Sequence, residues 1–152
     1  MKKIAIIILL KLFYISNAYG LIEVDITRGN LDPLPIAVSP LHVDIKSEKF
    51  EGLKVKSLGS DISSVIEKNF KSTGLFNPLK KDAFVQKPDI AHIKPRFEDW
   101  RLIKAQALVT GKILVKDSKL KVEFRLWDLT ASKEMIALAF TTTPSNWRRV
   151  AH

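Results

Sequence analysis

The side chains best suited to metal chemistry are three histidines, and they lie far apart in the sequence. A transition-metal site needs three or four ligands at a motif spacing. His42, His92 and His152 each lack a second ligand at such a spacing, and the chain contains no cysteine. We therefore predict no metal site and no thiol chemistry, and we expect each histidine to stand alone on the surface or in a loop.

Carboxylates and nucleophiles give no better case for catalysis. Glu98 and Asp99 are adjacent, so on a helix they point in different directions and do not form an acid/base pair. Asp128 is expected to be a turn residue at the end of a strand. The glycines are too widely separated for a phosphate loop, and no serine stands in a nucleophile-elbow pattern. We predict no catalytic residue, no cofactor-binding residue and no enzymatic activity.

Basic and aromatic residues raise the possibility of nucleic-acid binding. Trp100-Arg101 and Trp147-Arg148-Arg149 place stacking rings beside cations. We favour the interpretation that each Trp faces a core and each Arg faces solvent, and we expect no nucleic-acid partner. The formal charge is +9, but the lysines are scattered. The alternative is a basic accessory domain that adheres to an anionic membrane surface or a polyanion.

The first twenty residues resemble a secretory signal peptide. Two early lysines precede an apolar run over residues 4–15, and small residues follow at Ala18 and Gly20. A membrane-spanning helix needs ~20 apolar residues, and Lys11 interrupts this shorter run. We predict export with cleavage after Gly20 or Ala18, and no membrane span in the cleaved chain. Cleavage removes three lysines and no acid, which lowers the charge from +9 to +6.

The first half of the remaining chain predicts two strands and a helix. Residues 21–29 alternate apolar and polar side chains, and residues 36–38 form a short apolar run between prolines. Residues 41–56 read as a loop with at most one extended piece. A helix follows, capped by Ser57 or Ser60 and ended by Gly74. Its apolar stripe consists of Leu58, Ile62, Val65, Ile66 and Phe70.

The second half predicts a short helix and three long strands. Residues 75–95 suggest short extended pieces joined by loops, and residues 95–105 a second helix. Strands are expected at 107–115, 120–129 and 134–143, the first two as an antiparallel hairpin. The predicted fold class is α/β, of the α+β type: a mixed, partly antiparallel sheet of about five strands backed by two helices, plus a truncated C-terminal helix from Pro144.

Several stretches in order resemble one known family. The resemblance rests on the signal peptide and the strand that ends at Gly29, and on five motifs: PIAVSPL (35–41), STGLFNPL (72–79), ALVTGKI (107–113), FRLWDL (124–129) and NWRRVAH (146–152). Together they are similar to the amino-terminal domain of the TolB family, periplasmic proteins of the Tol-Pal system. The resemblance covers nearly all of residues 21–152, which we take as one domain after a signal peptide at 1–20.

This resemblance implies a non-enzymatic binding protein. It also implies a role in outer-membrane integrity and in outer-membrane invagination during cell division. In the family, the α/β domain is followed by a six-bladed β-propeller that carries most of the contact to Pal, an outer-membrane lipoprotein. The helix that begins at NWRRVAH continues there, so we expect this chain to break off before the propeller. A non-functional remnant is therefore a further alternative.

The resemblance also implies a movable arm that contacts the carboxy-terminal domain of TolA. From the residues themselves, the alternation at 21–27 suits a strand that adds to a sheet edge, either of this domain or of a partner. Both interpretations stay open. The implied TolA-binding arm comprises Leu21, Ile22, Glu23, Val24, Asp25, Ile26, Thr27, Arg28, Gly29, Asn30, Leu31 and Asp32.

Overall fold

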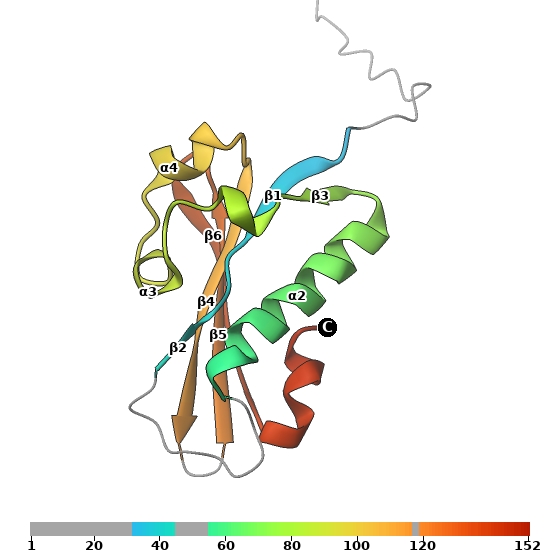
Figure 1. The fold of residues 1–152 in the computed structure, drawn as a ribbon, viewed down its shortest axis with the longest axis vertical. Helices are drawn as coiled ribbons and strands as arrows, with labels where there is room; N and C mark the ends of the chain where they lie inside the picture. Colours follow the sequence, from blue (N-terminus) through green and yellow to red (C-terminus); the bar gives the residue numbers. More distant parts are fainter. Residues whose placement is uncertain (1–31, 45–54, 117–118) are drawn as a thin grey trace, which may run out of the picture. The chain divides into compact units, whose positions relative to one another are not determined.

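The structure is a computed structural model that describes residues 32–44, 55–116 and 119–152. Within them, one six-stranded sheet has the order β3-β1-β4-β5-β6, and β2 also pairs with β4 (Figure 1). The strand predicted at residues 21–29 lies outside the described residues. The strands are β1 (Leu34–Val38), β2 (His42–Val43), β3 (Phe76–Pro78), β4 (Ala107–Lys116), β5 (Lys119–Asp128) and β6 (Lys133–Thr142).

The predicted mixed sheet is confirmed. Strand β1 runs parallel to β3 and β4, whereas β4, β5 and β6 form an antiparallel series. The hairpin register pairs Ala107 with Asp128 and Lys116 with Lys119. The short strands β2 and β3 fall where the sequence suggested loops with extended pieces, because pairing to β4 and β1 fixes segments too short to show a period.

Helix α2 (Val55–Thr73) is the main helix, and it ends at Gly74 as predicted, with a φ of 71°. It starts ahead of Ser57 and Ser60, so the prediction that one of them caps the helix is wrong. The hydroxyl of Ser57 instead donates to the Asp61 carboxylate at 2.9 Å. The other helical segments are η1 (Lys81–Ala83), α3 (Pro88–Ala91), α4 (Phe97–Leu102) and η2 (Pro144–Val150).

Helices cover both faces of the sheet. Figure 1 shows α2 and η2 on one side of the strands and α3 and α4 on the other. On the α2 side, Leu58 and Ile62 pack with Ile113 and Val122 of the hairpin. All four side chains are almost fully buried, and burying an aliphatic side chain contributes about 1.5–3 kcal/mol. None of the described helices is long and apolar enough to cross a bilayer.

On the other side, Trp100 of α4 is the largest fully buried side chain of the described residues, so it faces the core as predicted. It is 1% exposed and packs with Ala37, Leu108 and Trp127. The Gln86 side-chain oxygen accepts hydrogen bonds from Trp100 Nε1 (2.8 Å) and from the backbone N–H of Arg96 (3.0 Å). Helix α4 is shorter than the predicted 95–105.

The helix predicted from Pro144 near the carboxyl end is present, and the structure shows it as a 3₁₀ helix with a kink. In η2, Asn146 has non-helical dihedral angles. Trp147 and Val150 still pack against the α2 core, and Asn69 of α2 donates to the Ala151 carbonyl at 3.1 Å. The Arg148 guanidinium lies 4.9 Å from the centre of the Trp147 ring, a cation–π distance.

Candidate partner-binding surface

The predicted TolA-binding arm lies almost entirely outside the described residues. Residues 21–31 are among those that the structure does not describe, and Asp32 is exposed just before β1. The TolA-binding assignment therefore stays a prediction.

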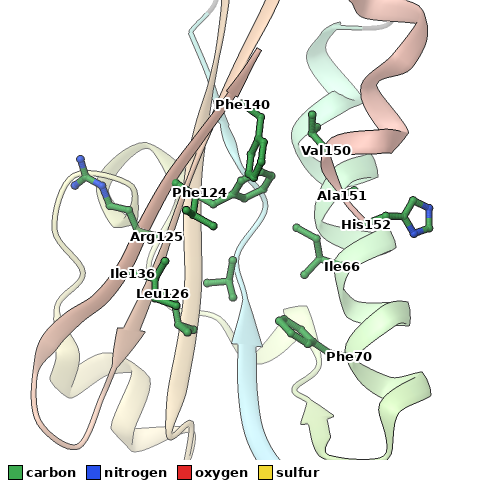
Figure 2. A pocket seen from close by; sticks show the side chains of 12 residues that line it. Ile66, Phe70, Phe124, Arg125, Leu126, Ile136, Phe140, Val150, Ala151 and His152 are labelled. Atoms are coloured by element: carbon green, nitrogen blue, oxygen red, sulfur yellow. The ribbon is translucent and has the colours of Figure 1, made fainter. Parts of the chain in front are cut away.

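An apolar groove lies on the α2 side of the sheet. It has a volume of about 290 Å³, and its wall is apolar apart from Arg125 and His152. Figure 2 shows Ile66 and Phe70 reaching toward it from α2, with Phe124 and Phe140 opposite. The lining residues are Ile66, Phe70, Val109, Phe124, Arg125, Leu126, Ile136, Leu138, Phe140, Val150, Ala151 and His152.

The groove exists because the sheet is wider than the helical layer on it. Among the described residues, the buried core under α2 takes its sheet side chains from β1, β4 and β5 and none from β6. On β6, Ile136, Leu138 and Phe140 are therefore 49%, 52% and 44% exposed. The rings of Phe124 and Phe140 meet edge to face at 6.1 Å. A surface of this kind suits docking of another apolar surface.

The opposite face of the sheet carries a pair of stacked histidines. His42 of β2 and His92, after α3, have ring centres 4.3 Å apart and nearly parallel planes. The prediction that each histidine stands alone is wrong for this pair, because α3 packs against β2 and β4. His92 Nδ1 donates to the Pro88 carbonyl at 2.9 Å. Burial lowers the pKa of His92, and the charges of Lys112 and Arg125 act in the same direction.

Charged side chains beside this pair neutralise one another. Glu123 lies 2.9 Å from Lys121 Nζ and 3.8 Å from Lys112 Nζ. The hydrogen bond from Lys121 is the main reason that the pKa of Glu123 is lowered. Arg125 pairs with Glu134 at 3.6 Å and donates to the Ile93 carbonyl at 3.2 Å. His92, Lys112, Glu123 and Arg125 line a small polar hollow of about 180 Å³. Both cations that line it, Lys112 and Arg125, are thus already engaged.

No catalytic constellation is evident among the described residues. They contain no group of three or more histidines and carboxylates that could hold a metal ion. Burial raises the pKa of Glu67, but its carboxylate lies 3.2 Å from Lys81 Nζ. Lys81 also donates to Ser63 and Ser64, so this cluster fastens η1 to α2. Asp128 accepts the Ala131 N–H at 2.8 Å, which confirms its predicted turn role.

The family model for the TolB amino-terminal domain matches residues 22–135, more than half of the chain. The chain belongs to the TolB amino-terminal domain family. The resemblance stated from the motifs is thereby confirmed. One TolB relative, the Tol-Pal system protein TolB of Pelagibacter ubique (strain HTCC1062), is 68% identical over 138 residues. These residues make up 90% of this chain but 31% of that protein, so the chain spans less than a third of its length.

Solved structures show the same fold. TolB from Acinetobacter baumannii superposes with a TM-score of 0.61 at 19% identity, over 80% of this chain and 26% of that one. The LpoB C-terminal domain from Escherichia coli superposes with a TM-score of 0.53 at 6% identity, over 72% of this chain and 82% of that one. At such identities the likeness concerns the fold alone, and it agrees with the predicted α+β class.

Sequence reasoning missed the groove. The alternation of Ile136, Leu138 and Phe140 identified a strand, but it did not tell which sheet neighbours or helices cover that strand. The available signal was that the sequence predicts one long helix but three long strands. One helix covers only part of such a sheet. The histidine pair gave no local signal, since the pairing of β2 with β4 and the packing of α3 against both strands bring the two rings together.

Proposed function

We propose that the chain is a non-enzymatic, protein-binding domain of the Tol-Pal system. Its membership in the TolB amino-terminal domain family carries this proposal, and the 68% identity to a Tol-Pal system protein supports it. In this role the domain contributes to outer-membrane integrity and to invagination during cell division. The proposed location is the periplasm, with residues 1–20 as the signal peptide and 21–152 as the binding domain.

The proposed partner of the arm is the carboxy-terminal domain of TolA. Residues 21–32 would bind it as an added strand, with Val24 and Ile26 on the apolar side of the alternation. Pal is the second proposed partner, although the family expectation places its main contact in the propeller.

Calorimetric titration of the purified protein with the carboxy-terminal domain of TolA tests the arm. We expect saturable binding that is lost when residues 21–32 are deleted and strongly weakened by Val24→Glu. The matched control is Val85→Glu, the same substitution at a valine that is 67% exposed on a loop after η1. Affinity that survives the deletion, or that falls equally in both valine variants, would contradict the arm assignment.

Electrostatic adhesion to an anionic surface has less support. The described residues include six ion pairs, among them Lys81–Glu67 and Arg96–Asp99. Each of the six cations in these pairs has a carboxylate beside it, which weakens its attraction for a further anion. Vesicle binding that falls steeply with added salt, in the absence of any TolA affinity, would favour the basic accessory domain instead.

A further inference from the structure

The two ends of the described sheet differ in how well they are protected against further pairing. Strand β3, at one end, has three residues and includes Pro78, and such short, proline-containing edges resist added strands. Strand β6, at the other end, has ten residues without a proline and pairs only with β5 among the described strands. None of the other described strands pairs with its second row of backbone N–H and C=O groups.

Within the part of the chain that the structure describes, strand β6 is also largely exposed on both faces. All but the last of its ten residues are exposed. Charges occur only at its beginning, at Lys133 and Glu134, and a bulge lies between there and Ile136. From Ile136 onward the strand has neither charge nor proline. Edges of this composition associate with other strands unless something covers them.

The sequence of this edge is symmetric in side-chain size. Residues 136–140 read Ile-Ala-Leu-Ala-Phe, large and small residues alternating about Leu138. In an antiparallel pairing of this strand with itself, a two-fold axis at Leu138 sets Ile136 opposite the second copy's Phe140. The alanines then face each other on the other side of the sheet. Shifting the axis by one residue, to Ala139, sets Ile136 opposite Thr142 and loses that match.

We propose that β6 pairs antiparallel with β6 of a second copy of this chain, about a two-fold axis at Leu138. The pairing joins the two sheets into one and brings the two apolar grooves side by side on the same face. The positions of the charged residues on β6 are compatible with pairing to a second copy. Lys133 and Glu134 fall beyond the apolar run, next to Thr142 and Thr143 of the second copy, so no like charges meet. A two-fold interface of this kind is closed and stops at the dimer.

Sedimentation equilibrium of the purified protein over a range of concentrations tests the association. We expect a monomer–dimer equilibrium. Leu138→Glu would place two carboxylates on the axis and raise the dissociation constant by roughly tenfold or more. The matched control is Leu102→Glu, at a leucine of α4 that is 80% exposed and outside this surface, and it should dimerise like the wild type.

A cysteine scan tests the register without destabilising the edge, since the chain has no cysteine of its own. Opposite residues of an antiparallel pair have Cα atoms roughly 4.5–5.5 Å apart, within disulfide range. Under mild oxidation with diamide, Leu138→Cys should form covalent dimers rapidly, whereas Phe140→Cys should not. A protein that stays monomeric, assemblies that grow past the dimer, equal cross-linking at both positions, or another protein bound to β6 would each overturn the proposal.

Discussion

At the scale of single residues, the stacked histidines are the clearest case of chemistry that the fold creates. Two rings in parallel contact lose water on their inner faces, and burial accordingly lowers the pKa of His92. The sequence does not predict this stacking, because each histidine lies in an ordinary loop or strand segment. The contact depends on where β2 joins the sheet and where α3 packs on it.

The lowered pKa of His92 predicts acid sensitivity with a definite sign. Below the ordinary value of 6.5, the unfolded chain binds a proton that the folded chain resists. Stability is therefore fully present above about pH 6.5 and falls as the pH decreases through it, with a slope of at most about 1.4 kcal/mol per pH unit. Urea unfolding between about pH 7 and 5 should show a flatter pH dependence in His92→Phe than in the wild type.

His152→Gln provides the control for that series, since it removes an exposed histidine far from the stack. It should keep the wild-type slope. If His92→Phe and the wild type lose stability in parallel on acidification, another group is responsible for the acid limb.

At the scale of elements, close backbone approach decides what a helix residue must be. Gly59 lies near the start of α2, and its carbonyl accepts the Leu41 N–H at 3.1 Å. A Cβ at Gly59 would come within 2.0 Å of the Leu41 carbonyl oxygen. The helix and the chain leaving β1 are thus in direct backbone contact, and only a residue without a side chain permits it.

This contact reverses the usual effect of replacing glycine by alanine in a helix. Alanine is normally favoured there by about 1 kcal/mol, but we expect Gly59→Ala to destabilise the fold by roughly 1–3 kcal/mol through overpacking. Chemical denaturation with a constant m-value would measure the loss. Ser60→Ala, at the next and exposed position, should be neutral or slightly stabilising. An equal gain in both variants would show that the backbone contact yields without cost.

Elements with a clear local hydrophobic period could be predicted from the sequence. Elements that depend on pairing with distant segments could not. The stripe from Leu58 to Phe70 and the alternation from Leu120 to Leu126 each determine a face by local period alone, and both appear as predicted. Strand β2, with two residues, has no period to detect. Pro144 predicted the helix start, but it does not distinguish a 3₁₀ helix from an α-helix, so the sequence left the type of η2 open.

At the scale of the whole molecule, the sheet connects two cores that otherwise have separate members. Leu108 of β4 packs with Trp100 on the α4 side, while the next residue, Val109, packs with Ile36 on the α2 side. Alternation along one strand therefore makes each core depend on the same backbone pairing. The α4-side core cannot lose β4 without exposing the α2-side core as well.

This coupling predicts one cooperative unfolding transition, which bears on the alternative that the chain is a poorly folded remnant. In Trp147→Phe, the remaining fluorescence comes from Trp100 and Trp127, which report the α4 side of the sheet. The far-ultraviolet circular dichroism of the described helices comes mainly from α2, on the other side. We expect both signals to change with the same midpoint, because neither core can stay folded once β4 has left the sheet. Separate midpoints, or a broad transition in both signals, would mean that the faces unfold independently and would favour the remnant.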